Sequence, residues 1–166
     1  MLRPIVLEAP DSIAARELLG LTHYRLGKWK DAIIQLEAFI SLAGYSTEQH
    51  PVLADCYRAL KKYARVDELW EELREASPSA ELMVEGRMVA AGALGDQGRL
   101  ADAIRLLEKG WKTPQNPKEY HLRRAYALAA LYERAGDLPT ARNLFGWIVR
   151  NDPDFADAAQ RFQATR

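Results

Sequence analysis

The sequence predicts an all-α protein built as an α-solenoid, in which pairs of antiparallel helices stack along the chain. Three observations predict this fold. One spacing of small, apolar and turn residues recurs four times. The apolar residues of each predicted helix form a single stripe at helical spacing, and no stretch alternates apolar and polar residues as a half-buried strand does.

The recurring spacing is clearest in LAALYERAGDLPTARNLF, residues 128–145. Two helical segments meet there at the hinge glycine, Gly136. Leu128 and Ala129 precede it by eight and seven residues, and Ala141 and Phe145 follow it by five and nine. The same offsets recur in three further copies: Leu19, Gly20, Gly27, Ala32 and Leu36; Leu53, Ala54, Lys61, Val66 and Trp70; Ala90, Ala91, Gly98, Ala103 and Leu107. In the second copy a lysine replaces the hinge glycine.

The hinge positions 27, 61, 98 and 136 are 34, 37 and 38 residues apart. A period near 34 with this pattern resembles the tetratricopeptide repeat (TPR) family, in its bacterial type, along nearly the whole chain. The resemblance implies helix-turn-helix repeats in a right-handed superhelix with an extended concave surface. It also implies a non-catalytic scaffold or interaction module that binds a protein or a peptide.

We expect one repeat domain over residues 1–166, with repeats at 13–46, 47–83, 84–121 and 122–153 and a C-terminal capping helix at 154–166. Residues 1–12 form either part of a preceding repeat or a tail. Pro10 lies 34 residues before Gly44, at the position of the proline that ends a repeat. This spacing favours a chain that starts inside a repeat.

The helices of the first two repeats have recognisable ends. Asp11 or Ser12 is expected to cap a first helix that reaches about residue 26. Pro51 suits the first position of a later helix, because its missing N–H would be unpaired there. Two second helices are expected, over residues 29–42 and 66–76. Their predicted core residues are Ala32, Ile33, Leu36, Phe39 and Ile40, and then Val66, Leu69, Trp70 and Leu73.

The second half follows the same plan. Ser77 and Pro78 begin a long third pair that ends near Gly110. In the next helix we expect Asn116 as the N-cap, Pro117 as the first helical residue and Glu119 in a capping box. The last pair ends near residue 150. A terminal helix that starts at residues 152–153 then covers the final repeat through Phe155, Ala159 and Phe162.

Composition excludes several classes of protein. Lys plus Arg and Asp plus Glu both number 23 in 166 residues, so no overall field favours nucleic acid. Cys56 is alone, which excludes an internal disulfide and predicts a small buried hydrophobe in a reducing compartment. No apolar run approaches the length that spans a bilayer, and the N-terminus lacks the apolar core of a signal peptide. We expect a cytoplasmic protein without membrane association.

The sequence contains only incomplete versions of known phosphate-binding and metal-binding motifs. Residues 20–28 have six residues between the glycines of a phosphate-loop pattern, which needs four. The acidic residues at 151–157 lack the glycine and distal glutamate of a calcium loop. His23, His50 and His121 have no HExxH or CxxC companion; His23 is expected between helices and the other two at helix starts. We therefore expect no enzyme, no cofactor and no bound metal.

The resemblance places a binding groove on the first helix of each pair. The predicted partner-binding residues are Glu17, Leu21, Tyr24, Arg25, Asp55, Arg58, Lys62, Glu85, Met88, Gly92, Arg123, Tyr126, Ala130 and Glu133. This mixture suits an extended peptide or a partner helix, with Arg123 and Tyr126 as the leading contacts. It departs from the carboxylate clamp of chaperone-binding members, whose Lys and Asn positions are occupied here by Glu17 and Leu21, or by Pro51 and Asp55 one repeat later.

Charged residues are distributed unevenly along the chain. The two charged clusters are either solvated helix faces or two patches that bind a partner. The acidic patch holds Asp67, Glu68, Glu71, Glu72, Glu75, Glu81 and Glu85 against Arg74. The basic patch holds Arg105, Lys109, Lys112, Lys118, Arg123 and Arg124 against Glu108 and Glu119.

Other functions remain open alongside the interaction module. The chain is alternatively the regulatory C-terminal part of a longer protein whose N-terminal region carries an activity. An RNA-binding repeat is a second alternative, which needs basic and aromatic groove residues where this chain has Leu21, Asp55, Gly92 and Ala130. Self-association through the N-terminal repeat is a further expectation, because Ile5, Val6 or Leu18 would be left partly unshielded.

Overall fold

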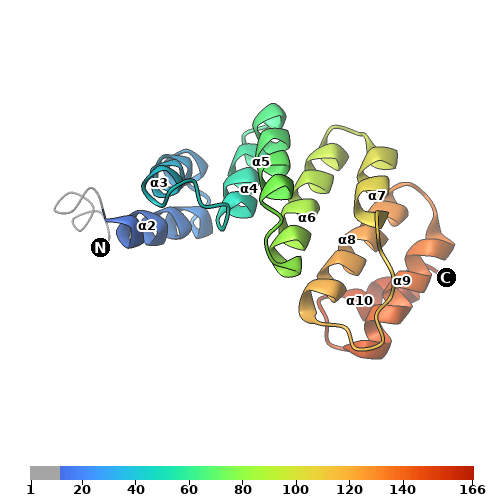
Figure 1. Cartoon of the computed structure of the whole chain (residues 1–166). Helices are drawn as coiled ribbons and strands as arrows, with labels where there is room; N and C mark the ends of the chain where they lie inside the picture. Colours follow the sequence, from blue (N-terminus) through green and yellow to red (C-terminus); the bar gives the residue numbers. More distant parts are fainter. Residues whose placement is uncertain (1–11) are drawn as a thin grey trace. The chain divides into compact units, whose positions relative to one another are not determined.

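The computed structural model describes residues 12–166, and within that range it holds nine helices and no strand (Figure 1). The prediction of an all-α fold is confirmed. The helices are α2 (Ile13–Arg25), α3 (Trp29–Leu42), α4 (His50–Ala59), α5 (Tyr63–Ala76), α6 (Ala80–Asp96), α7 (Leu100–Glu108), α8 (Glu119–Arg134), α9 (Leu138–Asn151) and α10 (Ala158–Ala164). The predictions for residues 1–11, including a partial preceding repeat and a cap at Asp11, lie outside the described residues.

The helices group into two compact units, one ending at Val89 and the other running from Ala90 to Arg166. In the first unit α2 packs on α3, α3 on α4 and α4 on α5. In the second, α7 packs on α8, α8 on α9 and α9 on α10. Each unit thus repeats one rule, in which a helix packs on the helix that follows it. The assignment of all residues to a single repeat domain stays a prediction.

The signature positions of the repeat form the core of both units. In all four copies the residues eight and seven before the hinge, and five and nine after it, are buried: Leu19, Gly20, Ala32 and Leu36; Leu53, Ala54, Val66 and Trp70; Ala90, Ala91, Ala103 and Leu107; Leu128, Ala129, Ala141 and Phe145. A Cβ atom on Gly20 would lie 2.8 Å from Cδ2 of Leu36. Small residues on the first helix therefore make room for large ones on the second.

The hinges share one backbone conformation. Gly27, Gly98 and Gly136 have φ values of 69°, 76° and 84°, and Lys61 has a φ of 59° in the same left-handed region. The second copy of the repeat therefore makes the same turn as the others, although its side chain favours the right-handed region. The lysine carries a local strain that the glycines avoid.

Several predicted helix ends are confirmed and others are wrong. Ser12 caps α2, with its Oγ accepting from the N–H of Ala15 at 3.2 Å, and α3 spans the predicted residues. Helix α4 begins one residue before Pro51, and α5 begins at Tyr63, three residues earlier than predicted. In α3 four of the five predicted core residues are buried, whereas Ile33 is only partly buried.

The predicted start of α8 at Pro117 is wrong. Lys118 is extended, with φ −89° and ψ 167°, and the helix begins at Glu119. The ring of His121 takes the role assigned to Glu119, because its Nδ1 accepts from the N–H of Lys118 at 2.9 Å. The imidazole occupies the third helical position, from which it reaches back to the residue before the helix. His50 and His121 both lie at helix starts, as predicted.

The terminal helix also begins later than predicted, at Ala158. The carboxylate of Asp152 accepts from the N–H of Asp154 at 3.1 Å, a local turn that competes with a helix. Ala156 then takes a φ of 46°, which a helix excludes. As a result Ala158, and not Ala159, is the fully buried alanine of α10.

The C-terminal cap is held by aromatic rings and one arginine. Phe155 and Phe162 pack against a buried cluster around Ala129, Phe145 and Ala158. The guanidinium carbon of Arg161 lies 4.7 Å from the ring centre of Phe145, within the range of a cation–π contact. These contacts cover the last repeat, which would otherwise expose its apolar face.

The opposite end of the described chain exposes more apolar surface. Leu18, Leu26 and Ile34, in or beside α2 and α3, are 49%, 64% and 61% exposed. Exposed apolar side chains favour association when they form a contiguous patch. Self-association through this repeat stays a prediction.

We expect Lys61→Gly to raise the free energy of unfolding by about 0.5 kcal/mol or more, because glycine removes the left-handed strain at this hinge. Gly136→Ala is the matched opposite change. An added Cβ there meets nothing within 4 Å, so its cost of about 1–2 kcal/mol is backbone strain alone. Urea unfolding followed by circular dichroism measures both, and a loss of stability in Lys61→Gly would contradict the hinge assignment.

Tyr126 tests the cap. Its hydroxyl donates to Asp157 and accepts from Nη1 of Arg161 at 2.9 Å, and its ring lies 5.8 Å from that of Phe145. We expect Tyr126→Phe to lower the free energy of unfolding by about 0.5–1.5 kcal/mol through the lost hydrogen bonds. Tyr126→Ala should lower it by about 2–4 kcal/mol, because the ring contacts are also lost. Equal urea midpoints for Tyr126→Ala and the parent protein would show that the ring stabilises nothing.

Candidate functional site

The first helices of the first two repeats, α2 and α4, are joined by hydrogen bonds between polar side chains. The hydroxyl of Tyr24 donates to Oδ2 of Asp55 at 2.7 Å. Nε2 of Gln49 donates to Oε1 of Glu17 at 2.8 Å. Both bonds connect the two repeats, so the side chains that face this surface are held in one geometry.

Several predicted groove residues therefore meet in the structure. Arg58 approaches the second oxygen of Asp55 at 3.6 Å, so Tyr24, Asp55 and Arg58 form one cluster. Burial, followed by the hydrogen bond to Asp55, raises the pKa of Tyr24. The phenol thus stays protonated and keeps donating.

The other predicted residues of this unit differ in exposure. Leu21 and Met88 are partly buried, Glu85 is also partly buried, and Arg25 and Lys62 are exposed. Their binding role stays a prediction. Only Glu85 among them reaches the hollow described next.

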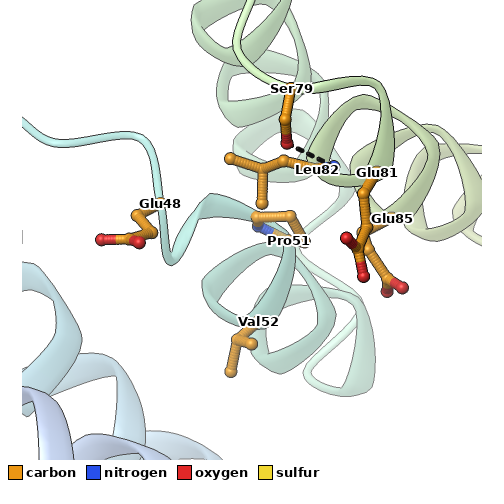
Figure 2. Close-up of a pocket in the computed structure, with 7 residues that line it drawn as sticks. All are labelled: Glu48, Pro51, Val52, Ser79, Glu81, Leu82 and Glu85. Atoms are coloured by element: carbon orange, nitrogen blue, oxygen red, sulfur yellow. Dashed lines mark hydrogen bonds between the residues drawn. The ribbon is translucent and has the colours of Figure 1, made fainter.

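A pocket of about 410 Å³ opens beside the α2–α4 cluster, where α4 and α6 begin. Figure 2 shows Glu48 on one side of the pocket and Glu81 and Glu85 on the other, with Pro51 and Leu82 between them. The full lining is Glu48, Pro51, Val52, Ser79, Glu81, Leu82 and Glu85. The pocket therefore has an apolar floor and an acidic rim.

Local sequence explains how the pocket is built. Pro51 fixes the first turn of α4 and is itself buried. Ser79 precedes α6, and its Oγ accepts from the N–H of Leu82 at 3.2 Å (Figure 2), as an N-terminal capping side chain does. These two helix starts place apolar side chains of both first turns around one hollow.

Of the seven lining residues, the predicted groove includes only Glu85 and the predicted acidic patch adds Glu81, because the groove prediction considered only positions along the middle of each first helix. The sequence did contain a signal for the pocket. Pro51 and the Ser77-Pro78 pair mark the starts of two successive first helices. In stacked repeats such starts lie at the same end, so carboxylates near them converge.

A second hollow of about 460 Å³ lies between the α3–α4 connection and the end of α5. Its lining includes Tyr45, Glu75 and the buried ring of His50, whose Nε2 lies 2.7 Å from Oε2 of Glu72. This hollow involves second helices, and none of the predicted groove residues lines it.

In the unit from Ala90 to Arg166, the predicted residues Gly92, Arg123, Tyr126, Ala130 and Glu133 have different surroundings. Tyr126 and Glu133 both bind Arg161 of α10. Arg123 is exposed, and Gly92 and Ala130 are partly buried. Partner binding by these residues stays a prediction.

Many charges of the two predicted patches are engaged within the protein. In the acidic patch Arg65 approaches Glu68 at 3.0 Å and Glu72 at 3.4 Å. In the basic patch Arg124 donates to the carbonyl oxygen of Leu107 at 2.9 Å and lies 5.5 Å from the ring centre of Trp111. Arg124 thus holds the chain after α7 in place. Partner binding by either patch stays a prediction.

Reactive groups are few in the described part of the chain. Residues 12–166 contain no group of three or more His, Cys, Asp or Glu side chains placed to hold a metal ion. Cys56 is buried, and burial raises the pKa of its thiol to about 12. The nucleophilic thiolate is therefore scarce at neutral pH. None of the helices in residues 12–166 is long and apolar enough to cross a bilayer.

Alkaline pH should destabilise the protein. Burial raises the pKa of Tyr24, Tyr57, Tyr126 and Tyr132. The protonated phenols therefore contribute to the free energy of unfolding in full below the tyrosine pKa of the unfolded chain, about 10. This contribution is lost as the pH rises above that value. Urea midpoints should fall above about pH 10, and less steeply in Tyr24→Phe. The control is Tyr45→Phe, because Tyr45 is 78% exposed. Identical declines in the two variants would contradict the assignment of Tyr24.

Comparisons with known proteins identify the fold. No family model and no curated protein matches the sequence. Two solved structures resemble it along 99% of its length. TTC0263, a thermophilic TPR protein in Thermus thermophilus, has a TM-score of 0.73 at 17% identity over 86% of its own chain. YrrB, a TPR protein with an unusual peptide-binding site, has a TM-score of 0.62 at 13% identity over 81% of its chain. The chain has the fold of the tetratricopeptide repeat proteins.

Proposed function

We propose that this chain is a non-catalytic module that binds a segment of another protein, an extended peptide or a helix, on the surface of its first helices. The observation that carries the proposal is the pocket of about 410 Å³ beside the bonded α2–α4 cluster. The peptide-binding site described for YrrB, which shares the fold, supports the same kind of ligand. We keep the cytoplasm as its expected location.

The bonded cluster suits recognition because it is already ordered. Tyr24 is held by Asp55, and Glu17 is held by Gln49, before any ligand arrives. Binding then costs less side-chain entropy than it would on a mobile surface. The pocket supplies the recess into which one ligand side chain can insert.

The proposed contact residues around the cluster and the pocket are Glu17, Leu21, Tyr24, Arg25, Asp55, Arg58, Lys62, Glu85 and Met88. In the second unit the proposal keeps Arg123 and Ala130 as contacts. Tyr126 and Glu133 act there through Arg161, which both of them bind.

Selection of random displayed peptides against the full chain tests the function without a known partner. We expect enrichment of related sequences, and perturbed amide signals of α2, α4 and α6 in NMR titrations with a synthesised winner. Asp55→Ala should lower the affinity for that peptide by about threefold or more, because the substitution removes the hydrogen bond that holds the ring of Tyr24. The control is Asp67→Ala on α5, whose carboxylate lies on a second helix.

Two outcomes would contradict this function. One is the absence of any enriched sequence. The other is a set of perturbed signals confined to the second helices α3, α5, α7 and α9, which would move binding to the opposite surface of the repeats.

A further inference from the structure

We propose that the pocket between α4 and α6 binds one large apolar side chain of a peptide that carries lysine or arginine on both sides of it. This inference rests on the proposed function and specifies the chemistry of its ligand. Its basis is the combination of an apolar floor, an acidic rim and a volume suited to a side chain.

The floor is built from Pro51, Val52 and Leu82. A volume of about 410 Å³ falls within the range of roughly 300–1,000 Å³ found for small-ligand sites. It therefore accommodates a leucine or phenylalanine side chain together with part of the peptide backbone. Burying such a side chain contributes the apolar part of the binding free energy.

The rim carries three carboxylates and no cation, because Glu48, Glu81 and Glu85 are the ionisable residues that line the pocket. They stand on both sides of the floor in Figure 2. Neither Glu48 nor Glu81 forms an ion pair within residues 12–166. Both carboxylates can thus accept charge-assisted hydrogen bonds from a ligand without breaking an existing pair.

The two helix starts oppose this charge but do not cancel it. Pro51 belongs to the first turn of α4, and Glu81 to the first turn of α6. Each helix N-terminus corresponds to about half a positive charge, so the pair offsets roughly one negative charge, whereas Glu48 and Glu81 together carry two. The remaining field repels acidic peptides and nucleic-acid phosphates, and it attracts a cationic peptide.

The orientation of the ligand follows from this arrangement. An apolar side chain that enters between Pro51 and Leu82 places the preceding and following residues over opposite sides of the rim. Cations at these two positions meet Glu48 on one side and Glu81 on the other. A single cation would leave one side of the rim unmatched.

Fluorescence anisotropy on the full chain with defined peptides tests the inference. The panel has three labelled peptides of equal length, with the central sequences Lys-Lys-Leu-Lys-Lys, Glu-Glu-Leu-Glu-Glu and Lys-Lys-Gly-Lys-Lys. We expect the first to bind at least about tenfold more tightly than the acidic peptide, and about threefold or more tightly than the glycine peptide. The charge preference should shrink when the ionic strength rises to about 0.15 M.

Variants locate the binding. Glu48→Gln combined with Glu81→Gln should lower the affinity for the peptide with the central sequence Lys-Lys-Leu-Lys-Lys, the lysine–leucine peptide, by about fivefold. The matched control is Asp31→Asn combined with Glu75→Gln, which removes the same charge from exposed positions of α3 and α5 that form no ion pair within residues 12–166, and it should leave binding within about twofold. Circular dichroism confirms that both variants are folded.

The inference is overturned if the acidic peptide binds as well as the basic one, if both double variants weaken binding equally, or if the lysine–leucine peptide fails to bind at about 1 mM. Displayed-peptide selection separates these failures from failure of the proposed function. If selection yields acidic or neutral peptides that perturb α2, α4 and α6, the function stands and the basic ligand is wrong. If selection also yields no enriched peptide, both the proposed function and the basic ligand are wrong.

Discussion

Close approach of the two helices within each repeat is the constraint on which the rest of the structure depends. It requires a small residue on the first helix opposite a large one on the second, as Gly20 lies opposite Leu36. It also requires a left-handed hinge that reverses the chain in very few residues. When both conditions recur along the chain, each helix can pack on the helix that follows it, as α2, α3, α4 and α5 do in the first unit.

The use of the signature positions for helix packing limits where a binding site can lie. The signature residues are buried in the core, so the proposed recognition uses residues outside the signature, on the outer faces and at the starts of the first helices. Tyr24 and Asp55 illustrate the outer faces, where one bond between repeats also orders a surface. Pro51 and Ser79 illustrate the starts, where residues that define a helix end also shape a pocket. In the proposed function the same residues would serve both folding and binding.

Electrostatics separates the pocket from the other charged surfaces. The net charge of the chain is zero, and many exposed carboxylates of α5 are paired with arginines of the same helix. Exposed pairs of this kind contribute little to stability and leave little field. At the pocket three carboxylates share one rim without a cation among its lining residues. A local field can therefore direct a ligand even though the whole molecule is neutral.

The sequence by itself determined the helical class, the repeat and its core, because these depend on local spacing: glycine at position 136 permits a left-handed turn, and alanine at 129 and 141 permits close packing. Of the pocket the sequence-based prediction named only Glu85 in the groove and Glu81 in the acidic patch, since it followed the middle of each first helix and not the helix starts, where the other lining residues lie. Tertiary structure decided the remainder. It forced Lys61 into a disfavoured conformation and directed Tyr126 to the cap. A residue's local preference is worth about 1 kcal/mol, whereas the packing of whole helices is worth several times more, so contacts distant in sequence prevail where the two disagree.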